Sequence, residues 1–105
     1  MAAWLDQVRA ASGLTLWALA NLLAGRCGYP VSSIWRQLHA YRRGRTPRPG
    51  GWLDRVPEVA AAARHPDDPE ARARLQEALT DGLARARQQM LAARRAKSEK
   101  TPYPG

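Results

Sequence analysis

Apolar residues recur at spacings of three and four along most of the chain, which predicts helices rather than strands. A first stripe, formed by Trp4, Leu5, Val8 and Ala11, predicts a helix over residues 2–12, and Gly13 follows as a stop. Thr15 is a suitable N-cap for a second helix over residues 16–24, closed by Gly25. The expected buried face of this second helix is Leu16, Leu19, Ala20 and Leu23.

A connection rich in helix breakers, residues 25–31, leads to a third predicted helix. Ser32 is its expected N-cap, and the helix runs over residues 33–43 with Gly44 as its end. Ile34, Leu38 and Tyr41 share one face of this helix, which is therefore its inward face. Residues 46–51 hold two prolines and two glycines and are expected to form a loop.

The second half begins with an apolar segment around Trp52 that Pro57 divides into two short helices, the second ending near Arg64. A longer helix follows from Pro69 to about Lys97, after a cap by Asp67 or Asp68. The expected fold class is all-α. It comprises a compact helix-turn-helix domain of four to five short helices over residues 1–65, a C-terminal helix within 66–97, and a disordered tail over 98–105.

Positive charge is concentrated in two blocks of the chain, whose formal net charge is +8 with a pI of about 11.0. Residues 26–55 carry +6 and residues 71–105 carry +5, whereas residues 1–25 are neutral and residues 56–70 carry −3. A strongly basic block in a small chain indicates a polyanionic partner.

Few residues offer catalytic or metal-binding chemistry, so we expect no enzyme, no cofactor and no metal. Cys27 is the only cysteine, and neither His39 nor His65 has further ligands nearby in the sequence. The apolar run over residues 14–24 is much shorter than the ~20 residues that cross a bilayer. We expect no membrane partner and a cytoplasmic location, in a bacterial cell or a phage-infected host.

The third predicted helix has the composition of a helix that enters a DNA groove. With its apolar face inward, Ser33, Arg36 and Gln37 turn outward; arginine pairs with guanine, and glutamine with adenine. Arginines at the end of the helix and in the next loop are suited to phosphates. The candidate DNA-binding residues are Ser32, Ser33, Arg36, Gln37, Arg42, Arg43, Arg45 and Arg48. The alternative for Arg36 and Gln37 is an ordinary solvated helix face.

Tryptophans accompany these basic residues. Trp17, Trp35 and Trp52 are expected to be core or half-buried packing residues. For Trp35 a contact with the sugar-phosphate backbone, or stacking on a single-stranded base, remains open.

Four segments together resemble the Cro/CI-type (XRE-like, lambda-repressor-like) helix-turn-helix family. They are Val8 to Thr15, Leu19 to Leu23, Val31 to Ile34, and Arg42 to Pro47, the last reading Arg-Arg-Gly-Arg-Thr-Pro. The resemblance covers roughly residues 5–60. It implies five compact helices and operator binding, often as a dimer, with Ser32 and Ser33 at the start of the recognition helix and Arg36 and Gln37 facing the groove.

The C-terminal helix has three interpretations. It packs on the small domain and completes the core, it pairs with a second copy of itself, or its basic end lies along phosphates. We favour a homodimer through a seam of Leu75, Leu79, Leu83 and Met90, because a dimer doubles the phosphate contacts and matches a two-fold symmetric site.

The expected function is sequence-specific binding of double-stranded DNA by a transcriptional regulator, a repressor or activator of phage or mobile-element type. The alternative is a phage protein whose helix-turn-helix serves assembly or inhibition of a larger machine, such as a packaging subunit or a host-enzyme inhibitor, or an antitoxin. In these alternatives a protein is the main partner.

Overall fold

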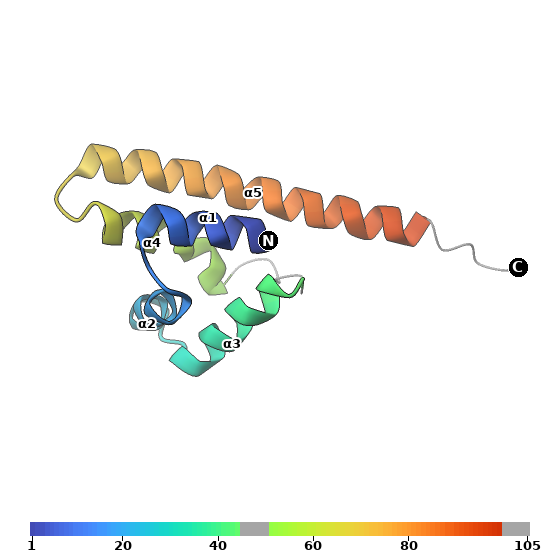
Figure 1. The fold of residues 1–105 in the computed structure, drawn as a ribbon, viewed down its shortest axis with the longest axis horizontal. Coiled ribbons are helices and arrows are strands. Elements are labelled where there is room, and N and C mark those ends of the chain that lie inside the picture. Colours follow the sequence, from blue (N-terminus) through green and yellow to red (C-terminus); the bar gives the residue numbers. More distant parts are fainter. Residues whose placement is uncertain (45–50, 100–105) are drawn as a thin grey trace, which may run out of the picture.

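Helices alone make up the regular structure of the residues described by the computed structural model, which are 1–44 and 51–99, apart from the side chains of Arg94 and 96–99 (Figure 1). The elements are α1 (Ala2–Ser12), α2 (Leu16–Cys27), α3 (Val31–Arg42), the short 3₁₀ helix η1 (Gly51–Arg55), α4 (Val56–Arg64) and α5 (Pro69–Glu99). The all-α prediction is confirmed. Of the predicted tail, residues 98 and 99 belong to α5 and residues 100–105 lie outside the described part.

The connection between α1 and α2 forms as its residues predict. Gly13 ends α1 in a left-handed conformation, with φ of +72°. The Thr15 hydroxyl accepts a hydrogen bond from the Ala18 N–H at 3.1 Å, which satisfies one unpaired donor in the first turn of α2. The expected stop and cap are therefore confirmed.

The turn between α2 and α3 is shorter than the sequence predicts. The helix α2 passes through Gly25 and ends at Gly28, whose φ is +73° and whose N–H donates to the Ala24 carbonyl at 3.0 Å. Pro30, not Ser32, precedes the first turn of α3, so only residues 28–30 separate the two helices. The added turn of α2 packs Cys27 against the core, which explains why the helix does not stop at Gly25.

The two glycines of α2 give substitutions of opposite sign. Gly25→Ala is expected to stabilise the fold by about 0.5–1 kcal/mol, because alanine is the better helix former and nothing lies within 4 Å of the new methyl group. Gly28→Ala is expected to destabilise it by about 1–2 kcal/mol, because its left-handed backbone disfavours a Cβ. Urea denaturation followed by circular dichroism measures both. A destabilised Gly25→Ala protein would contradict the position of the helix end.

One core joins all the helices. Its fully buried members come from every α-helix and from η1: Leu5, Val8, Leu19, Leu23, Ile34, Leu38, Leu53, Val56 and Leu79. The division at Pro57 is confirmed, since η1 ends at Arg55 and Pro57 lies in the first turn of α4.

The helix α5 belongs to this core through its first half. The indole N–H of Trp4 in α1 donates to the Leu79 carbonyl at 2.9 Å. Gly82 allows this approach, because a Cβ there would lie only 3.0 Å from Cδ1 of Trp4. Of the three interpretations of the C-terminal helix, packing on the small domain is therefore confirmed.

The predicted seam between copies needs correction. Leu79 and Leu83 are 0% and 3% exposed and pack inside their own chain, so neither presents a side chain to a second copy. Leu75 is half-buried against the same core, and Met90 is half-buried further along α5. The apolar stripe of α5 is chiefly an intramolecular packing face.

Candidate nucleic-acid interface

The helices α2 and α3 form a helix-turn-helix pair. They pack against each other and are joined by the three-residue turn 28–30, a length typical of this motif (Figure 1). In α3, Ile34, Leu38 and Tyr41 are buried, as their spacing predicts. The opposite side of α3 is therefore directed to solvent.

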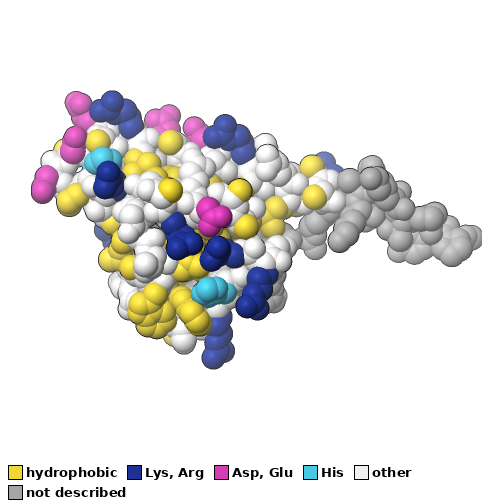
Figure 2. Space-filling view, viewed as in Figure 1, with side chains coloured by type: hydrophobic (Ala, Val, Ile, Leu, Met, Phe, Trp, Pro, Cys, Tyr) yellow, Lys and Arg dark blue, Asp and Glu magenta, His cyan; other side chains and the backbone are white. Residues whose placement is uncertain are grey.

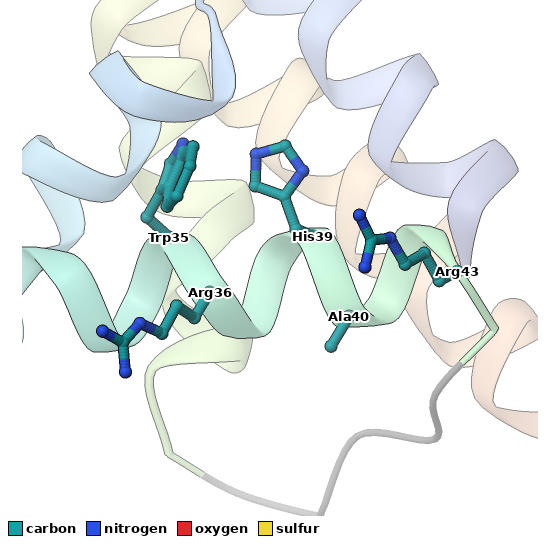
Figure 3. A pocket seen from close by; sticks show the side chains of 5 residues that line it. All are labelled: Trp35, Arg36, His39, Ala40 and Arg43. Atoms are coloured by element: carbon teal, nitrogen blue, oxygen red, sulfur yellow. The ribbon is translucent and has the colours of Figure 1, made fainter.

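Two arginines occupy the outer side of α3. Arg36 and Arg43 are exposed and lie seven residues apart, which places them on the same side of the helix two turns apart (Figure 3). Within residues 1–44 and 51–99, neither forms an ion pair. Their charges are therefore available to a polyanion, as the sequence predicts.

Two arginines elsewhere in the fold are paired with acids from other elements. Arg26 of α2 bonds Glu58 of α4 at 2.7 Å, and Arg87 of α5 bonds Asp54 of η1 at 2.6 Å. Figure 2 shows the acidic side chains mainly over α5 and the connection before it, with basic side chains among them, while basic and hydrophobic side chains share the α3 side. Arg36 and Arg43 therefore differ from Arg26 and Arg87, because no acidic side chain of the described residues pairs with them.

Arg42 has a different environment from Arg36 and Arg43. Its guanidinium lies 3.7 Å from the Asp6 carboxylate of α1, which also lies 3.9 Å from Arg9. One carboxylate shared by two arginines leaves a net positive charge at this edge. Both side chains of the Arg42–Asp6 pair are exposed, so the pair contributes little to stability.

Gln37 is exposed, but its amide is held at the flank of α3. Its Oε1 accepts a hydrogen bond from the Trp52 indole N–H at 3.1 Å and a longer one from the Tyr41 hydroxyl at 3.4 Å. Because an indole N–H only donates, the oxygen must be the atom that faces Trp52. A bidentate contact with adenine uses both the oxygen and the nitrogen of the amide, so Gln37 would have to leave Trp52 to make one.

The serines lie in the first turn of α3, with Ser32 exposed and Ser33 half-buried. The Ser33 N–H already donates to the Pro30 carbonyl at 3.1 Å. Ser32 is thus exposed to solvent in the first turn of α3, on the same surface as Arg36. Arg45 and Arg48, the remaining predicted phosphate contacts, lie outside the described residues.

The tryptophans divide into two classes. Trp52 is buried, as expected, whereas Trp17 is 54% exposed and Trp35 is 38% exposed. Trp17 and Trp35 therefore lie outside the core, as partly exposed residues. Their rings meet edge to face, 5.9 Å apart, across the junction of α2 and α3.

A histidine extends this aromatic cluster toward the arginines. The His39 ring lies 4.4 Å from the Trp35 ring at an interplanar angle of 73°. Together with Arg36, Ala40 and Arg43, these two rings line a shallow hollow (Figure 3). The sequence did not predict this ring pair, for which the spacing of four residues between Trp35 and His39 is the signal.

The described residues contain no cluster of three or more His, Cys, Asp or Glu side chains positioned to hold a metal ion. Among them there is also no helix that combines the length and apolar character needed to span a membrane.

Comparisons with known proteins add no relative to these observations. No family model matches the chain, and no match emerges among curated proteins or solved structures. The function of the protein is therefore inferred from the geometry and charge of α2 and α3.

Proposed function

We propose that this protein is a transcriptional regulator that binds double-stranded DNA by placing α3 in the major groove. The observation that carries the proposal is the outer side of α3, where Arg36 and Arg43 lie exposed without an acidic partner in the described structure. A helix fits the major groove, which is about 12 Å wide.

The two arginines have separate roles in this proposal. Arg36 lies near the middle of α3 and is the candidate for a bidentate contact with guanine O6 and N7. Arg43 follows the last residue of α3 and is the candidate for a phosphate contact, together with Arg42. A polyanion would compete with Asp6 for Arg42, since that ion pair is long and exposed.

The resemblance of residues 5–60 to the Cro/CI-type family supports a regulator of phage or mobile-element type, acting in the cytoplasm of a bacterial cell or an infected host. A homodimer on a two-fold symmetric operator is part of this proposal. Its contact surface lies elsewhere than Leu79 and Leu83, which are buried in the monomer core.

Selection of bound duplexes from a random pool tests the proposal. We expect one enriched sequence, and binding that weakens steeply with salt. If about six phosphates are neutralised, the logarithm of the binding constant falls against the logarithm of the salt concentration with a slope near −5. Fluorescence anisotropy with the enriched duplex measures the slope. Binding that is indifferent to salt, or a pool without enrichment, would refute sequence-specific regulation.

A protein partner is the second candidate, and the surface of α2 favours it. Residues 10–25 hold no charged side chain, and α2 exposes Trp17 at 54% and Leu22 at 42%. Exposed apolar groups of this size, when contiguous, mark interaction sites. Under this alternative, the helix-turn-helix serves the assembly or inhibition of a larger machine, or the protein is an antitoxin. Light scattering separates the cases, because a ring-sized oligomer indicates assembly and a dimer indicates regulation.

A further inference from the structure

The hollow on the outer side of α3 combines two aromatic rings with two cations. It has a volume of about 500 Å³ and is lined by Trp35, Arg36, His39, Ala40 and Arg43. In Figure 3 the Trp35 and His39 rings rise side by side from α3, and the arginines lie along the same helix. Four of these side chains come from α3 and the fifth, Arg43, from the residue that follows it, so the relative positions of the first four are set by the helix itself.

The rings are held in a fixed arrangement although Trp35 is partly exposed. His39 contacts Trp35 at 4.4 Å and 73°, and Trp17 contacts it at 5.9 Å and 82°. The two rings of α3 therefore form a corner: a flat group stacked on one ring meets the edge of the other. Because these contacts already fix the rings, a ligand loses little side-chain freedom by stacking there.

A nucleotide with an unpaired base matches this chemistry. Its base offers a flat aromatic face to a ring of the corner, and the phosphates on either side offer charge to Arg36 and Arg43. A duplex hides its base faces within the stack, so it can use the arginines but not the rings. An acidic peptide likewise satisfies only the arginines.

We infer that the Trp35–His39 corner binds the face of an unpaired nucleobase, and that the protein thereby also binds single-stranded nucleic acid. This inference rests on the proposed function only in sharing Arg36 and Arg43 with it. Single strands and duplex are accordingly expected to compete for one surface.

The first test compares two single-stranded ligands with the unaltered protein. One is a thymidine 20-mer, and the other is a 20-residue abasic strand with the same sugars and phosphates but no bases. We expect the thymidine strand to bind about tenfold more tightly in fluorescence anisotropy, because base–aromatic stacking favours it. Equal affinity for the two strands would overturn the inference.

Variants then locate the contact. Trp35→Leu is expected to bind the thymidine strand about tenfold more weakly and the abasic strand unchanged. Tyr29→Leu is the matched control, since Tyr29 is also an exposed aromatic residue (50%) but does not line the hollow, and the affinity of this variant for the thymidine strand is expected to stay within about twofold. Equal losses in the two variants would count against the corner.

Intrinsic fluorescence gives an independent measurement. Of the four tryptophans Trp4 and Trp52 are buried, so Trp35 is the exposed one that remains in the Trp17→Leu protein. The thymidine strand is expected to quench its emission, and the abasic strand is not. Absence of quenching at saturating thymidine strand would overturn the inference.

Comparison with a 20-base-pair duplex separates this inference from the proposed function. If the protein binds the duplex but does not prefer the thymidine strand to the abasic strand, the inference is refuted and the proposed regulator function still stands. A thymidine preference without duplex binding refutes the regulator and leaves the inference. Failure of every nucleic acid to bind refutes both and favours a protein partner.

Discussion

Replacing Arg36 and Arg43 together by alanine is expected to weaken binding of the selected duplex about 100-fold at fixed salt. These two guanidinium groups lie on the exposed side of α3 and lack acidic partners in the described structure. One lost base contact costs about 1–3 kcal/mol, and a lost phosphate contact adds to it. Anisotropy titration of the labelled duplex measures the change, and the salt slope should decrease by about one for each lost phosphate contact.

The matched control removes the same charge from another face. Arg74 and Arg85 are exposed on α5, and neither forms an ion pair in the described part of the chain. Arg74→Ala with Arg85→Ala lowers the net charge equally, and we expect less than about a threefold loss because these side chains contribute only long-range attraction. Equal losses in the two double variants would mean that total charge, and not α3, determines binding.

Trp4→Ala is expected to lower the free energy of unfolding by about 4 kcal/mol. Trp4 is 3% exposed, packs beside Gly82 of α5, and donates to the Leu79 carbonyl. Truncation therefore leaves a cavity between α1 and α5 and removes a buried hydrogen bond. Such a loss is a large share of the ~5–15 kcal/mol that stabilises an ordinary domain. Urea denaturation followed by circular dichroism provides the measurement.

Two further variants separate the contribution of the Trp4 hydrogen bond from that of burying its ring. Trp4→Phe keeps an aromatic ring but lacks the N–H donor, so about 1–2 kcal/mol is expected from the lost hydrogen bond and the smaller ring. Trp17→Ala removes an indole that is 54% exposed, and its cost is expected to stay under about 1.5 kcal/mol, mostly from the contact with Trp35. If Trp4→Ala proved no more costly than Trp17→Ala, the burial of Trp4 between α1 and α5 would be wrong.

Local sequence patterns predict where the helices lie, but they do not show which of two similar stop signals ends a helix. Gly25 and Gly28 are both plausible ends for α2, and the sequence pattern favours the first. The structure ends the helix at Gly28, because the additional turn packs Cys27 on the core. Contacts with other elements decided between the two glycines, and periodicity within α2 holds no information about those contacts.

The same limit explains the seam predicted on α5. An apolar stripe buries itself equally well against a second copy or against its own chain. For Leu79 the partner is Trp4, which lies 75 residues earlier in the sequence. A glycine inside a helix ordinarily costs helix stability, whereas in this fold Gly82 makes room for that indole ring.

The candidate site was predictable to the extent that it depends on one helix. The inward face of α3 fixes the outward one, and Arg36 and Arg43 follow from it. The orientation of Gln37 depends on Trp52, a residue of another element, so helical geometry alone does not give the direction of its amide. The sequence left Trp17 and Trp35 either in the core or half-buried, because the spacing of an aromatic residue does not fix how far its ring is covered by other elements.

The hydrogen bond between Trp4 and Leu79 has a consequence for synthesis on the ribosome. The indole that emerges first finds its acceptor only after most of the chain has been translated, since the acceptor lies 75 residues downstream. Until α5 has left the exit tunnel, the growing polypeptide exposes the apolar side of its earliest segment. Nascent chains halted before Leu79 are thus expected to be readily digested by proteases, and chains from which the whole of α5 has left the tunnel are expected to resist.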